Sequence, residues 1–193
     1  SLEPAGWADT DSITLSWEGA ADACSGLAQM DVAIDGGTYT ALAVAENGSE
    51  IIDISALEDG THTLSLRLTD ALGNAAFWEH TFYLDVAPPE VELLTPPDGT
   101  VVTGVLDIWG SATDISLLDW TLTATGSSGK TVAIRTDTTE RASEQLGVLD
   151  TGEFADGETI EIVLVAHDQA GHESTARGVF IKADHSAQAI VAD

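Results

Sequence analysis

The chain has 193 residues, which suits one large domain or two of about a hundred residues each, and 44% of its residues are apolar, so it can bury a core. It carries 33 Asp and Glu against 6 Lys and Arg, a formal net charge of −27 that is spread along the whole length. Such a negative field repels nucleic acid and anionic membranes, and no stretch reaches the about 18 apolar residues of a membrane-spanning helix, so both nucleic-acid binding and membrane insertion are excluded.

Short β-branched runs with alternating polarity recur between Gly, Asp, Asn and Pro residues, while helical periodicity is hard to find. This pattern is typical of sandwiches or barrels made only of strands. It predicts strands, in chain order, at 13–17, 30–34, 39–44, 51–54, 63–69, 77–84, 91–94, 105–109, 119–125, 131–135, 159–166 and 177–182.

Two of these strands belong to an internal repeat. Asp59-Gly60 precedes the strand in which Leu64, Leu66 and Leu68 share one face, and Asp70-x-x-Gly-Asn follows it. Asp156-Gly157 precedes the strand with Ile160, Ile162, Leu164 and Ala166 on one face, and Asp168-x-x-Gly-His follows it. The Asp residues of both turns are expected to cap backbone amides. The period of about 97 residues, from Asp59 to Asp156, matches one immunoglobulin-size sandwich.

The boundary between the halves lies in Asp85-Val86-Ala87-Pro88-Pro89, because two prolines remove backbone donors and force extended backbone. The sequence therefore predicts two tandem immunoglobulin-like β-sandwich domains, all-β, at 1–87 and 88–185, with a tail or linker at 186–193. The short proline linker is expected to be stiff and to favour an end-to-end arrangement.

Cysteine and tryptophan give further expectations. The single Cys24 excludes an intrachain disulfide and is expected to be a buried thiol. Trp17, Trp109 and Trp120 lie in predicted strands and are expected to fill the cores. Trp7 lies outside the predicted strands and is the candidate for an exposed, ligand-binding platform.

The turn signatures, followed by a Pro-Pro linker and by Pro96-Pro97-Asp98-Gly99 at the start of the second half, resemble the bacterial immunoglobulin-like (Big-type) tandem repeat domains of large secreted and surface proteins and adhesins. The resemblance covers nearly the whole chain. It implies a non-catalytic, extracellular or cell-surface protein of a bacterium or archaeon, with neighbouring immunoglobulin-like repeats as its partners, and with a cell-surface glycan or protein as a further partner.

Calcium is the one metal that the acidic composition suggests, because it takes six to eight oxygen ligands. In an end-to-end pair of domains, several carboxylates are expected to meet at the junction. No EF-hand loop is present, and no other cofactor is required. The alternative is that these carboxylates form a solvated acidic coat. The candidate calcium ligands are Asp59, Asp85, Glu90, Asp114 and Asp168.

Enzyme chemistry finds no support, since neither a G-x-S-x-G elbow nor a phosphate-binding loop is present. The predicted function is a spacer, stalk or adhesive segment of a prokaryotic surface protein. Two alternatives stay open: a carbohydrate-binding accessory module of an extracellular enzyme, which a pair of solvent-facing tryptophans would favour, and a subunit segment of a filament or surface layer, which unpaired edge strands would favour.

Overall fold

The computed structural model describes residues 1–184 and divides into two compact units, Ser1–Ala87 and a second beginning at Pro88. Both units consist of β-strands, and a single 3-10 turn, η1 (Thr151–Glu153), lies in the second. No helix among the described residues is long and apolar enough to cross a lipid bilayer. The tail predicted at 186–193 lies outside the described residues.

The first unit is a sandwich of a three-stranded sheet, in the order β1-β3-β6, and a five-stranded sheet, in the order β2-β8-β7-β4-β5. All pairs are antiparallel except β2 with β8, which are parallel. The strands are Leu2–Glu3 (β1), Trp7–Ala8 (β2), Ser12–Trp17 (β3), Leu27–Ile34 (β4), Thr40–Leu42 (β5), Gly48–Asp53 (β6), Gly60–Asp70 (β7) and Ala75–Leu84 (β8).

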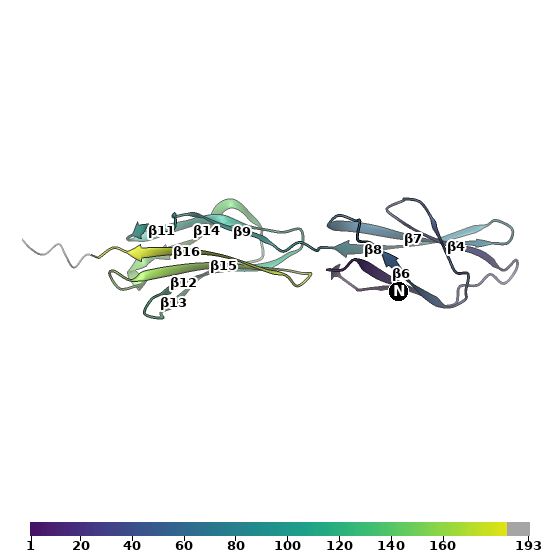
Figure 1. Cartoon of the computed structure of the whole chain (residues 1–193), viewed down its shortest axis with the longest axis horizontal. Coiled ribbons are helices and arrows are strands. Elements are labelled where there is room, and N and C mark those ends of the chain that lie inside the picture. The colour runs from purple at the N-terminus through teal and green to yellow at the C-terminus, as the bar shows by residue number, and fades with distance from the viewer. Residues whose placement is uncertain (185–193) are drawn as a thin grey trace, which may run out of the picture. The chain divides into compact units, whose positions relative to one another are not determined.

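The second unit repeats this arrangement strand for strand, with sheets in the orders β14-β11-β9 and β10-β16-β15-β12-β13 (Figure 1). Its one parallel pair, β10 with β16, corresponds to β2 with β8. Each unit is therefore an immunoglobulin-like sandwich, which confirms the predicted fold class. The strands are Glu90–Thr95 (β9), Val101–Val102 (β10), Val105–Thr113 (β11), Leu117–Gly126 (β12), Thr131–Asp137 (β13), Arg141–Asp150 (β14), Thr159–Asp168 (β15) and Glu173–Lys182 (β16).

Each unit has its own core, built from the inward face of alternating strands. The four residues predicted to face inward on β15 are all fully buried: Ile160, Ile162, Leu164 and Ala166. On β7, Leu64 and Leu66 are buried, whereas Leu68 is only half-buried. The predicted alternation is thus confirmed, and the first core is less completely covered at Leu68.

The twelve predicted strands are all present, mostly with longer bounds, because pairing with a neighbour extends a strand into polar residues. The prediction missed β14, whose first five residues are exposed or half-buried and polar or small, so they carry no alternation. It also missed β1, β2 and β10, each only two residues long.

Two side-chain predictions are wrong. Trp109 is 43% exposed, because Ile108, Gly110 and Ala112 take the inward positions of β11 and Trp109 falls on the other face. Cys24 is exposed, in the loop before β4. Trp120 is fully buried, as predicted, and its indole Nε1–H donates to the Thr139 carbonyl at 2.9 Å.

The two Asp turns cap backbone amides as predicted. Asp70 Oδ1 accepts from the N–H groups of Leu72 and Asn74, and Asp168 Oδ1 accepts from those of Gly171 and His172. Hydrogen bonds from Asn74 and Ser25 lower the pKa of Asp70 to about 2. Both motifs therefore serve to close the hairpins β7–β8 and β15–β16.

Candidate functional site

The strand β8 exposes more of itself than any neighbour in its sheet. Its residues Ala75–Thr81 are all exposed, and only Phe82 and Leu84 are buried. The strand pairs with β7 along one edge, while on the other edge the described part of the chain supplies only β2, which reaches Tyr83 and Leu84. The stretch Ala75–Thr81 is therefore a free sheet edge whose side chains are exposed on both faces.

Aromatic side chains gather along this edge. Phe77 is 64% exposed, and Trp78 is 38% exposed and stacks on His80 with ring centroids 5.4 Å apart and planes at 6°. Tyr83 is 38% exposed and lies 5.2 Å from the ring of Trp7. Trp7, Phe77, Trp78, His80 and Tyr83 together are named the β8 aromatic surface. Aromatic residues are enriched at sites that bind proteins.

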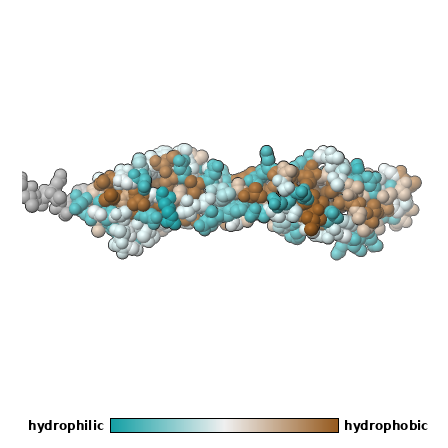
Figure 2. Space-filling view, viewed as in Figure 1, coloured by the Kyte–Doolittle hydropathy of each residue, from teal (hydrophilic) through white to brown (hydrophobic). Residues whose placement is uncertain are grey.

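The two faces of β8 carry different members of this surface, because side chains alternate along a strand. Phe77 and Tyr83 lie on the outer face of the five-stranded sheet. Trp78 and His80 lie on the face that turns toward the three-stranded sheet, in line with the buried Phe82. A hydrophilic surface interrupted by apolar residues is visible on the first unit in the space-filling view (Figure 2).

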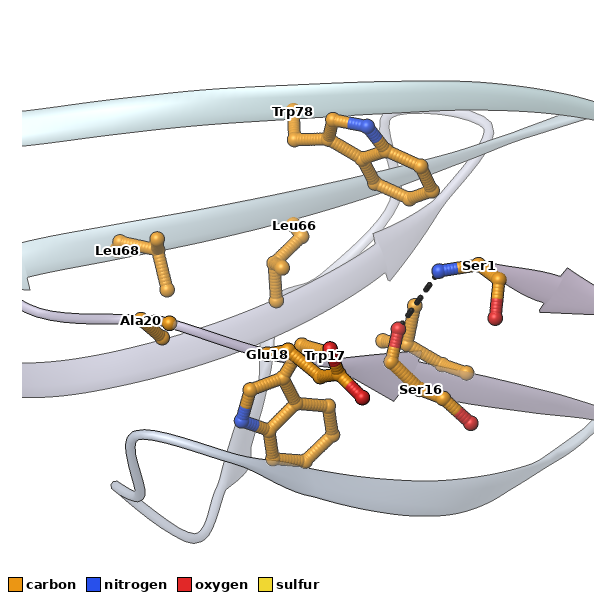
Figure 3. Close-up of a pocket in the computed structure, with 10 residues that line it drawn as sticks. Ser1, Ser16, Trp17, Glu18, Ala20, Leu66, Leu68 and Trp78 are labelled. Atoms are coloured by element: carbon orange, nitrogen blue, oxygen red, sulfur yellow. Dashed lines mark hydrogen bonds between the residues drawn. The ribbon is translucent and has the colours of Figure 1, made fainter.

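Trp78 borders a pocket of about 320 Å³ between the two sheets of the first unit. Figure 3 shows Trp78 and Leu66 pointing into it from the five-stranded sheet, with Trp17 and Glu18 on the opposite side. The lining is mainly apolar. Trp17 is held in place by a hydrogen bond from its Nε1–H to the Ala45 carbonyl at 3.1 Å.

The outer face beside Phe77 holds an internal ion pair. Arg67, the partner of Phe77 across the β7–β8 ladder, contacts Asp31 at 2.8 Å and lies 4.1 Å from the centre of the Tyr39 ring. Hydrogen bonds from Gln29 and Arg67 lower the pKa of Asp31 despite its burial. Arg67 is therefore already paired with Asp31 and lies over the Tyr39 ring.

In the first unit, two predicted calcium ligands make local hydrogen bonds, Asp59 through its carboxylate and Asp85 through its backbone N–H. Asp59 Oδ1 accepts the Val86 N–H at 2.9 Å, and the Asp85 N–H donates to the Ala8 carbonyl at 3.0 Å. The Asp59 carboxylate thus holds the backbone of Val86, two residues after the end of β8. The backbone of Asp85 continues the parallel pairing of β8 with β2.

In the second unit, Asp114 and Asp168 are brought together: a carboxylate oxygen of one lies within 4.8 Å of a carboxylate oxygen of the other. Asp114 Oδ1 accepts the Ser116 N–H at 2.7 Å, and Glu90 begins β9. Burial raises the pKa of Asp168, but hydrogen bonds from His172 and Gly171 outweigh it and lower that pKa. Calcium binding by the predicted set stays a prediction.

Of the β8 aromatic surface, the sequence predicted only Trp7, which is half-buried in β2 beside Tyr83. The signal for the rest was the run Phe77-Trp78, which places large aromatic side chains on both faces of one strand. A strand with one buried face and one solvated face instead alternates apolar and polar side chains.

No protein-family model matches the chain, and no curated protein matches it. Among solved structures, it is similar to a tetra-tandem repeat in the extending region of a large adhesion protein, with 21% identity, 94% of this chain and 48% of that chain covered, and a TM-score of 0.48. It is also similar to the FN1–FN3 domains of chicken CNTN1, with 13% identity, 93% and 64% covered, and a TM-score of 0.39.

A third similar structure is SGBP-B of the Bacteroides ovatus mixed-linkage glucan utilization locus, in complex with a mixed-linkage heptasaccharide. Its identity is 14%, the coverage is 92% of this chain and 42% of that chain, and the TM-score is 0.28. This chain spans less than two thirds of the length of each of the three structures. The Big-type assignment stays a prediction.

Proposed function

We propose that the chain is a non-catalytic extracellular module, a spacer or stalk segment of a prokaryotic surface protein. Two sandwiches of identical strand order, each with a separate core, follow one another in the chain. A module that adds length by repetition needs units that fold by themselves, and separate cores meet that need.

The observation that carries the proposal is the parallel pairing of the short second strand with the last strand in each unit. In the second unit, the Ile181 N–H donates to the Thr100 carbonyl at 3.0 Å and the Ala183 N–H donates to the Val102 carbonyl at 2.8 Å. Strands that run parallel from opposite ends of a unit slide against each other when those ends are pulled, so their hydrogen bonds are loaded together. This arrangement suits a protein that bears tension.

The test is single-molecule stretching of the chain through its two ends. We expect two separate unfolding events, one for each unit, because rupture under force depends on the unfolding rate of each sandwich. The matched control pulls the second unit at Ser128, in the β12–β13 turn, and at Lys182, which lies at the same end of the five-stranded sheet. The strands are then separated one hydrogen bond at a time, and the unit should unfold at lower force. Equal forces in both geometries would contradict a tension-bearing role.

Carbohydrate binding is the second candidate, and the pairing of Trp7 with the exposed Tyr83 favours it. Aromatic rings offer flat apolar faces against which sugar rings can stack. Calorimetric titration with soluble glycans should then show binding that Tyr83→Ala abolishes and that Trp109→Ala, at an exposed tryptophan of the other unit, leaves unchanged. Absence of heat with any glycan would remove this candidate.

A further inference from the structure

We propose that the free edge of β8 pairs antiparallel with the same edge of a second copy of this chain, so that the two five-stranded sheets join into one. This inference goes beyond the proposed spacer function, because it gives the module a self-association surface.

The direction of the backbone groups on β8 follows from its hairpin. The Asp70 N–H donates to the Asn74 carbonyl at 3.0 Å, which makes these residues a hydrogen-bonded pair of the β7–β8 ladder. Such pairs recur at every second residue of an antiparallel ladder, so the even-numbered residues of β8 bond to β7. The N–H and C=O groups of Ala75, Phe77, Glu79 and Thr81 therefore point to the free edge. Asp85 is also odd-numbered, and its N–H donates on the same edge to the Ala8 carbonyl, which agrees with this direction.

The equivalent edge of the second unit is covered at Val179 and Ile181. The Val179 N–H donates to Asp98 Oδ1 at 2.6 Å, the Val179 carbonyl accepts from Gly99 at 2.7 Å, and the Ile181 N–H donates to Thr100. The part of β16 left open carries Glu173 and Arg177. Charged side chains and covering loops are the usual devices that keep an edge strand from pairing with another chain.

The free part of β8 has only one of these devices, the carboxylate of Glu79. The segment 75–81, Ala-Ala-Phe-Trp-Glu-His-Thr, contains no Lys, Arg or Pro, and its one carboxylate is Glu79. The shortness of β1 does not explain this exposure. Its counterpart β9 has six residues, and it pairs with β11 and not with β16. An exposed, apolar edge of this kind is a template for strand addition.

The edge is self-complementary in one register, centred on Trp78. In that register Ala75 faces Thr81 of the second copy and Phe77 faces Glu79, so all four outward-pointing residues are used. The four pairs exchange about eight backbone hydrogen bonds. Trp78 then faces Trp78 of the second copy as a close, non-hydrogen-bonded pair, which favours aromatic contact.

Charge and length select the same register. A shift that centres the ladder on Glu79 places two carboxylates directly opposite each other, which is destabilising. With Trp78 at the centre, no like charges face each other, and the ladder ends at residue 81, before Tyr83, where β2 occupies the edge. A second copy therefore fits the free length of β8.

The net charge of −27 opposes the association of two copies. Salt screens this repulsion, whereas the backbone hydrogen bonds and aromatic contacts at the edge are little affected. We therefore expect the association to strengthen as the salt concentration rises.

The first experiment is sedimentation equilibrium of the whole chain in low and high salt. The wild type should form a dimer whose fraction rises with protein concentration and with salt. Glu79→Pro should be monomeric under the same conditions, because it removes a backbone donor on the free edge and no backbone hydrogen bond to β7. Its one loss toward β7 is the hydrogen bond that Ser65 Oγ donates to Glu79 Oε1 at 3.4 Å, so the fold of the variant is checked directly. A wild type that stays monomeric at high salt and millimolar concentration overturns the proposal.

The matched control is Thr175→Pro, at an outward-pointing position of β16, which should dimerise as the wild type does. Circular dichroism and the thermal midpoint of each variant show whether it is folded. If Glu79→Pro is folded and dimerises as well as the wild type, the edge of β8 is not the interface and the proposal is wrong.

A second experiment tests the register in a Cys24→Ser background, since Cys24 is exposed. Under oxidising conditions Trp78→Cys should form a disulfide-linked dimer, because residue 78 faces itself at a Cα separation of about 4.5 Å. Ala76→Cys should not, because the two positions 76 would lie about 13 Å apart along the ladder. Equal cross-linking of both variants overturns the proposed pairing.

Discussion

β8 and β16 hold the same position in two sandwiches of identical strand order, yet a loop covers Val179 of β16 and no described loop bonds the equivalent Thr81 of β8. The connection from β9 to β10 is five residues long, 96–100, and its Asp98 and Gly99 bond to Val179. The connection from β1 to β2 is only three residues long, 4–6. The longer loop therefore covers Val179, whereas the shorter one leaves the equivalent Thr81 of β8 open.

The cores differ in the same direction. The second unit buries Trp120 completely, whereas in the first unit Trp17 and Leu68 remain partly exposed at a pocket. A repeated topology thus leaves room for one unit to be closed and the other to offer a surface. The following predictions test this contrast, from the largest expected effect to the smallest.

The largest effect is expected from Trp120→Ala, which removes a fully buried indole. It should destabilise the second unit by about 3–5 kcal/mol and leave the unfolding transition of the first unit in place. The measurement is urea unfolding followed by circular dichroism. The control Trp109→Ala, at a 43% exposed position, should cost far less. An equal shift of both transitions would contradict separate cores.

Asp98→Ala should open the edge of β16 and make it resemble that of β8. Loss of the hydrogen bond from Val179 to a carboxylate is expected to cost the second unit about 1–2 kcal/mol, measured as a lower urea midpoint. Asp98→Asn keeps an acceptor oxygen and should lose less. If the two variants are equally unstable, this hydrogen bond does not protect the edge.

Acid should weaken the β7–β8 turn of the first unit. The pKa of Asp70 is about 2 in the folded chain, against an ordinary value of 3.8. Ionised Asp70 therefore stabilises the folded state above about pH 4, and this stabilisation is lost as the pH falls toward 2. Asp70→Asn should therefore lower the thermal midpoint at neutral pH and have little effect near pH 2. A difference from the wild type that is the same at both pH values would contradict this origin.

The smallest effect is expected from calcium, through the neighbouring carboxylates of Asp114 and Asp168. At fixed ionic strength, millimolar calcium should raise the thermal midpoint of the second unit by a few degrees relative to EGTA, because a ligand that binds the folded state stabilises it. Asp114→Asn should reduce this rise. No shift in the wild type would retire the calcium hypothesis.

The sequence by itself determined the fold class and the repeat. Alternation of apolar residues, as in Ile160, Ile162 and Leu164, is set by the two-residue period of a strand, and Asp70 and Asp168 cap turns within five residues of themselves. These are local effects. They depend only on residues that are close together in the sequence.

Only the tertiary structure decided which strands are covered. The exposure of Trp109 depends on which face of β11 turns to the core, and the free edge of β8 depends on the length of a loop some seventy residues earlier in the chain. Sequence periodicity gives the spacing of side chains along a strand, but whether a face or an edge meets solvent is fixed by the strands that lie beside it.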